Sequence, residues 1–129
     1  MDELLQKSFI AGVERVAAWA DLLDSINVFP VADGDTGRNL SISLFPLRNV
    51  YPDKSKIVQQ LLFSARGNSG NIASRFFSAF YAAKSVSELA DCAAEGRLRA
   101  WKAVSDPCAG TMLTLFDALA EALFSTGMI

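Results

Sequence analysis

Oxygen-bearing side chains are concentrated between residues 27 and 39, in the stretch NVFPVADGDTGRN. Two carboxylates, Asp33 and Asp35, lie one residue apart and are accompanied by Gly34 and Gly37. Mg²⁺ is typically bound in proteins by one or two carboxylates together with substrate phosphates and water. Glycines allow positive φ and let a phosphate approach the backbone closely. The spacing therefore predicts a site for a metal ion and a polyphosphate.

A helix is expected directly after these residues. Apolar residues recur at helical spacing from Leu40 onward, and the helix is predicted to begin near Arg38. The first N–H groups of a helix have no partner within the helix and favour a bound anion. We therefore expect this helix to direct its free N–H groups at a phosphate.

Two further glycine-containing segments have similar chemistry. GNSGN at residues 67–71 and PCAGT at residues 107–111 combine glycine with small polar side chains, and each precedes an apolar helical pattern. If alternate helix N-termini gather at one end of a bundle, the three segments converge there. The first would hold the metal, the second would offer N–H groups and the Ser69 hydroxyl to phosphates, and the third would line the nucleoside. None of them matches the GxxxxGK[ST] or GxGxxG motifs.

Each segment taken alone also has a simpler structural interpretation. Residues 33–35 are typical of a polar turn. Residues 67–70 are typical of a helix C-cap followed by an N-cap at Ser69. A calcium loop of the EF-hand type is excluded, because Arg38 and Leu44 occupy the positions that require glycine and a bidentate glutamate.

The composition favours a single folded domain over residues 1–129. The chain is 51% hydrophobic and has a formal net charge of −2, and its length is typical of one domain. No basic patch for nucleic acid is apparent, and no apolar run approaches the roughly 18 residues that span a membrane. The absence of histidine excludes Ser-His-Asp and Cys-His nucleophiles.

Two features indicate a cytoplasmic location. The N-terminal residues MDELLQKSF lack the layout of a secretory signal. Cys92 and Cys108 form no CxxC motif and are interpreted as thiols in a reducing compartment.

Helical periodicity extends over nearly the whole sequence. Helices are predicted over residues 3–24 and then through residues 40–47, 57–65, 72–80, 89–104 and 112–123. Prolines and glycines separate them. We therefore expect an all-α antiparallel bundle of about six helices. The large aromatic residues at helical spacing are predicted to lie in its core: Phe76, Phe77, Phe80 and Trp101.

Taken together, the three segments resemble one protein family. NVFPVADGDTGRN, SARGNSGNI and AWKAVSDPCAGTMLTLF are similar, in order and spacing, to the signature stretches of dihydroxyacetone-kinase-type (DhaL-like) nucleotide-binding domains. The branch they resemble most is the N-terminal domain of bacterial fatty acid kinase. The resemblance covers essentially all 129 residues. It implies a shortened antiparallel helical barrel, with about six of the family's eight helices and ATP or ADP at its mouth.

The resemblance also implies roles for individual residues. Asp33 and Asp35 match aspartates that hold two Mg²⁺ ions on the nucleotide phosphates, and the candidates for a further ligand are Asn27 and Asp24. The remaining contacts match the starts of three helices. The phosphate contacts match Thr36, Gly37, Arg38 and Asn39 in the first and Asn68, Ser69 and Gly70 in the second. The nucleoside contacts match Thr111 and Met112 in the third.

This sequence departs from the family pattern at four positions. Ala32 replaces a proline, Arg38 a threonine, Asn71 an aliphatic residue and Ala109 a glutamate. Arg38 adds a cation next to the predicted phosphate site.

Two classes of function follow from the resemblance. The first is the ATP- and Mg²⁺-binding domain of a phosphotransferase, whose acceptor is presented by a separate fatty-acid-binding or dihydroxyacetone-binding protein. The second is a non-catalytic module that binds a nucleotide or a partner. A barrel built for eight helices but lacking the last two would leave an apolar flank along Leu115, Leu119 and Leu123, so self-association is expected.

Overall fold

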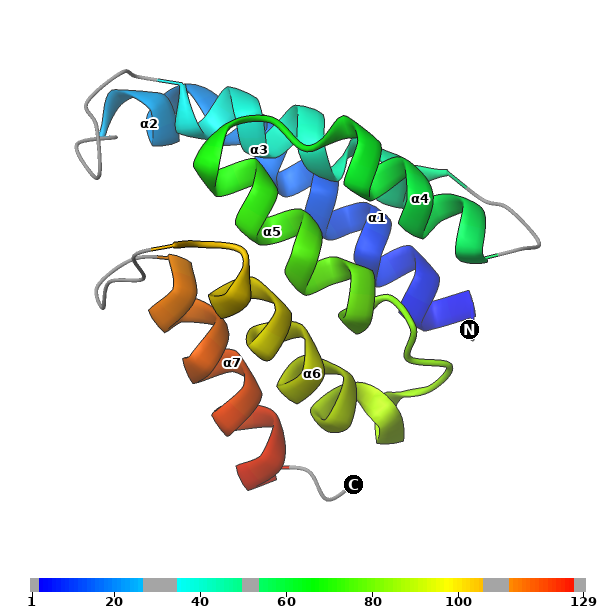
Figure 1. Ribbon diagram of the computed structural model, residues 1–129. Coiled ribbons are helices and arrows are strands. Elements are labelled where there is room, and N and C mark those ends of the chain that lie inside the picture. Colours follow the sequence, from blue (N-terminus) through cyan, green and yellow to red (C-terminus); the bar gives the residue numbers. More distant parts are fainter. Residues whose placement is uncertain (1–2, 27–34, 50–53, 106–111, 127–129) are drawn as a thin grey trace.

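The computed structural model describes residues 3–26, 35–49, 54–105 and 112–126, and every regular element in these ranges is a helix (Figure 1). In chain order the elements are α1 (Glu3–Ala18), α2 (Ala20–Ser25), α3 (Thr36–Leu44), the 3₁₀-helix η1 (Phe45–Arg48), α4 (Lys54–Ser64), α5 (Gly67–Phe80), the 3₁₀-helix η2 (Val86–Glu88), α6 (Leu89–Lys102) and α7 (Met112–Thr126). The predicted all-α fold class is confirmed. None of the described helices has the length and apolar character needed to cross a membrane.

The long helices run alternately in opposite directions. In Figure 1, α3, α5 and α7 begin on the left side of the molecule, whereas α1, α4 and α6 begin on the right. α3 packs against α1, α4 and α5, and α6 packs against both α5 and α7. The structure is therefore an antiparallel bundle in which the starts of α3, α5 and α7 lie at the same end.

The predicted first helix is interrupted at Trp19. α1 ends at Ala18 and α2 begins at Ala20, although the periodicity predicts one helix over residues 3–24. The N–H of Trp19 is shared between two carbonyl oxygens of the preceding turn, at 3.1 and 3.2 Å, an arrangement common at helix ends. The break sets α2 against the start of α3, where Ala20 lies so close to Gly37 that a Cβ at Gly37 would collide with the Ala20 backbone.

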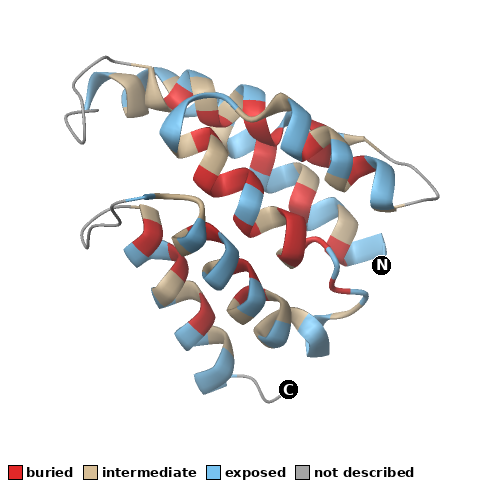
Figure 2. Ribbon diagram, in the orientation of Figure 1, coloured by how far each residue is buried: buried red, intermediate tan, exposed pale blue. Residues whose placement is uncertain are grey.

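The core is built around the phenylalanines of α5. Phe76 is fully buried and stacks on Phe116 of α7, with ring centroids 4.0 Å apart. Phe9 of α1 packs its edge against Phe80 and Tyr81. Phe77 and Trp101 are partly buried against the same cluster, so the predicted core position of these aromatic residues is confirmed. Figure 2 shows the buried residues on the sides of the helices that face one another.

Small residues allow α6 to approach α5 closely. Ala93, Gly96 and Ala100 are buried on α6, and a Cβ at Gly96 would lie 2.7 Å from the carbonyl oxygen of Phe76. The close packing of α6 on α5 therefore depends on the absence of a side chain at Gly96.

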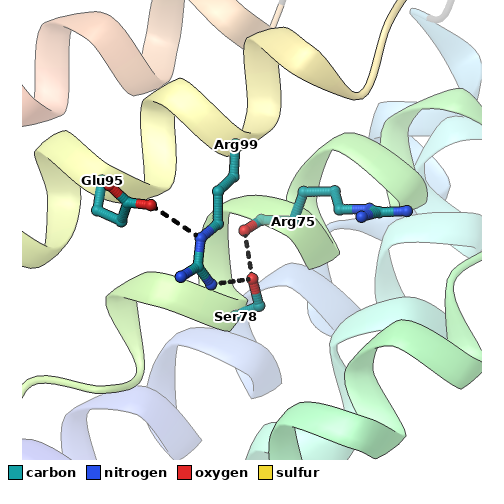
Figure 3. Close-up of polar contacts among 4 residues, drawn as sticks. All are labelled: Arg75, Ser78, Glu95 and Arg99. Atoms are coloured by element: carbon teal, nitrogen blue, oxygen red, sulfur yellow. Dashed lines mark hydrogen bonds and ion pairs between the residues drawn. The ribbon is translucent and has the colours of Figure 1, made fainter.

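Polar contacts join the same two helices (Figure 3). Arg99 donates from Nη1 to Ser78 Oγ at 3.2 Å and from Nε to Glu95 Oε1 at 3.2 Å. Ser78 Oγ donates in turn to the Arg75 carbonyl oxygen at 2.7 Å. The Arg99–Ser78 bond ties α6 to α5, and the Arg75 side chain points away from it (Figure 3).

The apolar flank predicted on α7 is only partly open. Leu115 is 63% exposed, whereas Leu119 and Leu123 are partly buried against the core. A separate apolar hollow of about 410 Å³ lies along α1 and is lined there by Phe9, Gly12 and Val16.

Candidate functional site

Of the three predicted metal ligands, the structure describes Asp35. Asn27 and Asp33 lie outside the described residues. Among the described residues, no group of three or more His, Cys, Asp or Glu side chains is arranged to hold a metal ion. The assignment of Mg²⁺ to Asp33, Asp35 and Asn27 therefore stays a prediction.

The start of α3 is capped by a carboxylate from α2. Asp35 is the N-cap residue, but its side chain makes no capping hydrogen bond. Instead, Asp24 Oδ1 accepts hydrogen bonds from the backbone N–H groups of Gly37, at 2.7 Å, and Arg38, at 3.1 Å. The sequence predicts that the N–H groups at this helix start face a phosphate. In the structure these two donate to Asp24.

Asp24 also borders a hollow between α2 and α3. The hollow has a volume of about 320 Å³ and is lined by Asp21, Asp24, Arg38 and Ser41, among others. Arg38 is exposed at its edge. The structure thus places a carboxylate and a guanidinium beside the first turn of α3.

The start of α5 packs directly against α3. Gly67 has a φ of +68°, which only glycine adopts without strain, and a Cβ there would lie 2.5 Å from Asn39 Nδ2. Gly70 faces Ser43, and a Cβ at Gly70 would overlap the Ser43 hydroxyl. The two segments predicted to contact phosphates, residues 36–39 and 68–70, are therefore held side by side.

Ser43 ties these two helix starts together. Its side chain is fully buried. Ser43 Oγ accepts a hydrogen bond from the Arg66 N–H at 2.8 Å, and its carbonyl oxygen accepts one from Ser64 Oγ at 3.1 Å. Sequence reasoning missed this residue. The sequence does contain a signal for Ser43: it follows Asn39 by four residues, and this spacing puts both side chains on one face of α3.

Ser69 lies inside the first turn of α5 and is not its N-cap. The N-cap is Arg66, whose backbone is extended and which forms no side-chain capping bond. The simpler interpretation of Ser69 as a helix cap is therefore wrong. The Ser69 hydroxyl is half-buried and has no hydrogen-bond partner among the described residues, and Asn68 beside it is exposed.

The third predicted segment is described only from Met112 onward, since Thr111 lies outside the described residues. Met112 begins α7 and is partly buried against the core. α7 begins on the same side of the molecule as α3 and α5 (Figure 1). The expected gathering of alternate helix starts is confirmed for these elements, while the nucleoside contacts of Thr111 and Met112 stay predictions.

The fold and the site define the protein as an all-α domain, an antiparallel helical bundle in which two glycine-containing helix starts pack together. Comparison with known proteins identifies its family. The family model of the DAK2 domain matches residues 30–128. The chain therefore belongs to the DAK2 domain family, which is the DhaL-type family expected from the sequence. Domains of this family are dihydroxyacetone-kinase-like modules that generally bind ADP or ATP.

The chain is also similar to staphylococcal proteins. An uncharacterized protein of Staphylococcus aureus (strain USA300) is 38% identical over 135 residues, which cover 93% of this chain and 25% of that protein. An uncharacterized protein of Staphylococcus saprophyticus is 34% identical over 137 residues, which cover 93% of this chain and 24% of that protein. The chain thus spans about a quarter of the length of the relatives it matches.

Proposed function

We propose that this chain is the Mg²⁺-dependent, ATP- and ADP-binding domain of a phosphotransferase. The observation that carries the proposal is the contact between the starts of α3 and α5, where Gly67 lies against Asn39 and Gly70 lies against Ser43. Through this contact the described residues predicted to bind phosphate, 36–39 on α3 and 68–70 on α5, lie side by side although they come from separate segments.

The two helix starts differ in how they are capped, and this suggests different roles. The start of α3 is satisfied by Asp24, whereas the N-cap of α5, Arg66, forms no capping bond, and among the described residues no other side chain caps this helix start. An uncapped helix start carries partial positive charge, and the Ser69 hydroxyl and the exposed Arg66 add donors beside it. This donor set fits a polyphosphate, so α5 is proposed as the main phosphate contact.

Asp35, together with Asp33 and Asn27, would hold Mg²⁺. When bound, the metal neutralises part of the phosphate charge, which two neighbouring aspartates would otherwise repel. Phosphoryl transfer depends mostly on positioning and charge neutralisation. A chain without histidine can therefore support it through carboxylates and backbone N–H groups.

The phosphate acceptor is proposed to come from a partner protein. The resemblance of residues 27–39 to fatty acid kinase favours the carboxylate of a fatty acid, with a small hydroxy-ketone as the other substrate class. A domain that binds Mg²⁺ and nucleotide but shows no transfer to either acceptor would correspond to the non-catalytic module.

Calorimetry with ADP tests the nucleotide site directly. We expect binding in the presence of Mg²⁺ and none in EDTA. The substitution Asp35→Asn should weaken binding by about 1–3 kcal/mol, the range for removing a charged hydrogen-bonding partner. Asp21→Asn, on the exposed side of α2, is the matched control and should bind like the wild type. Equal affinity with and without EDTA would overturn the metal assignment, and no affinity under either condition would overturn the proposed function.

A further inference from the structure

We infer that Asp24 is a positioning residue of the nucleotide site, which fixes the start of α3 through its carboxylate and does not bind the metal ion. This inference rests on the proposed function, because it assigns Asp24 a role in the same site. A carboxylate beside the predicted metal ligands can either bind the metal ion or hold the backbone in place, and the second role is the one assigned to Asp24.

The geometry supports positioning because one carboxylate oxygen serves two donors. Asp24 Oδ1 lies 2.7 Å from the Gly37 nitrogen and 3.1 Å from the Arg38 nitrogen. These N–H groups are among those at a helix start that have no partner within the helix. A negative charge there is also stabilised by the helix dipole. The oxygen is thus already committed to the backbone of α3.

The bond joins two points that are thirteen residues apart in the chain. Asp24 is the last but one residue of α2, and Gly37 is the second residue of α3. Asn27 and Asp33 lie between them in the sequence. The Asp24–Gly37 bond therefore fixes the distance between the two ends of the segment that contains these predicted metal ligands.

A second contact holds the same junction in place. Gly37 is buried against Ala20 of α2 so closely that no Cβ can be accommodated. The start of α3 cannot move toward α2 without a collision, and the Asp24 bonds oppose movement away from it. Together these contacts give α3 one fixed position relative to α2.

The charge of Asp24 also directs the phosphates elsewhere. A phosphate oxygen placed on the Gly37 and Arg38 N–H groups would meet the carboxylate that already occupies them, and like charges at such short range repel each other strongly. The phosphates are therefore expected at the start of α5, which no side chain of the described residues caps.

Two substitutions separate positioning from metal binding. Asp24→Asn keeps an oxygen that can accept the two N–H groups but removes most of the affinity for a cation, whereas Asp24→Ala removes both. If Asp24 positions α3, Asp24→Asn should bind Mg²⁺–ADP within about threefold of wild type, with an unchanged Mg²⁺ requirement. Asp24→Ala should bind at least about tenfold more weakly, the range for losing a charge-assisted hydrogen bond. Asp21→Ala, in the same hollow, is the matched control.

Amide hydrogen exchange measured by NMR adds a readout that needs no nucleotide. Exchange at Gly37 and Arg38 should be faster in Asp24→Ala than in wild type, and close to wild type in Asp24→Asn. Affinities are compared at a temperature where circular dichroism shows each variant folded. If Asp24→Ala does not fold, the Mg²⁺ titration of Asp24→Asn still decides between a positioning residue and a ligand.

The outcomes are distinguishable. A raised Mg²⁺ requirement in Asp24→Asn would make Asp24 a metal ligand and overturn the inference. Wild-type affinity in folded Asp24→Ala would also overturn it, by showing that the capping bonds serve stability alone. If the wild-type protein binds no Mg²⁺–ADP, the proposed function fails together with the positioning role. The wild-type titration alone reveals this failure, so it cannot be confused with an effect of the Asp24 variants.

Discussion

At the scale of single residues, Lys54, the first residue of α4, binds carbonyl groups at the end of the neighbouring helix α5. Its Nζ donates to the carbonyl oxygens of Tyr81, at 2.9 Å, and Ala83, at 3.0 Å, just beyond the end of α5. It also lies 5.4 Å from the centroid of the Tyr81 ring. A cation at this position satisfies carbonyl groups that the end of a helix leaves without partners. Burial lowers the pKa of Lys54 and raises the pKa of Tyr81.

These shifts predict how stability depends on alkaline pH. Burial also raises the pKa of the Cys92 thiol. A group whose pKa is higher in the folded state holds more protons there, so the free energy of unfolding falls as pH rises. The fall from Cys92 and Tyr81 begins near their ordinary values of 9.0 and 10.0. Lys54 has the opposite sign, because its folded-state pKa is the lower one, and it opposes part of this fall.

We therefore expect Tyr81→Phe to lose less stability than wild type on going from about pH 7.5 to about pH 10.5, since it lacks the shifted phenol. Urea unfolding at both pH values measures the difference. Wild type and variant losing the same amount of stability would contradict the prediction.

The hydroxyl of Ser69 supports a second residue-scale prediction. Because it has no hydrogen-bond partner among the described residues, Ser69→Ala should weaken Mg²⁺–ADP binding and leave the unfolding temperature nearly unchanged. Loss of a hydrogen bond to a charged phosphate corresponds to about 1.5–3 kcal/mol. Ser8→Ala, which removes an exposed hydroxyl on α1, is the control. A lower unfolding temperature with unchanged affinity would show that Ser69 supports the fold.

At the scale of elements, two helical glycines in different surroundings test how closely the helices must approach. Gly96 of α6 faces the backbone of Phe76, whereas a Cβ at Gly12 of α1 would meet nothing within 4 Å. Glycine inside a helix is less favourable than alanine by roughly 0.5–1 kcal/mol where space allows the exchange.

We expect Gly12→Ala to raise the free energy of unfolding by about that amount. Gly96→Ala should lower it by about 1–3 kcal/mol, because α6 must shift away from α5. Urea unfolding of the pair measures both effects against the same wild type. Stabilisation by Gly96→Ala would mean that the close packing of α6 on α5 is not required.

At the scale of the whole molecule, the α6–α7 pair is joined to the rest of the described fold mainly through α5. The two helices are held to each other by Asp117, whose Oδ1 accepts hydrogen bonds from Trp101 Nε1 at 2.8 Å and Arg97 Nη1 at 3.4 Å. On α7, Leu115 is 63% exposed. An exposed leucine beside an apolar helix face is a candidate contact for a second copy of the chain.

Self-association through α7 is therefore expected, and light scattering over a range of protein concentrations measures it. Leu115→Glu should shift the protein toward the monomer without unfolding it, because this side chain is largely outside the core. Leu119→Glu, at a partly buried position, should lower the unfolding temperature as well. A wild-type protein that stays monomeric at high concentration would contradict the prediction.

The sequence by itself determined the all-α class, the order of the long helices and the chemistry of the segments between them. Period-3.6 patterns and the dihedral preferences of glycine and proline are local properties, so they can be read without knowing the fold. The aromatic core followed in the same way, because Phe76, Phe77 and Phe80 lie at helical spacing on α5. The three motif segments, taken together, indicated the family.

Only the tertiary structure decided how the helix starts are built. The break at Trp19, the cap that Asp24 places on α3 and the link from Ser43 to Arg66 were not predicted. The cap and the link join residues thirteen and twenty-three positions apart. Such contacts depend on the packing of α2 and α5 on α3, where the absence of a side chain at Gly37 and Gly70 decides which backbones can meet. No local pattern encodes that proximity, because it arises from the burial of several helices at once.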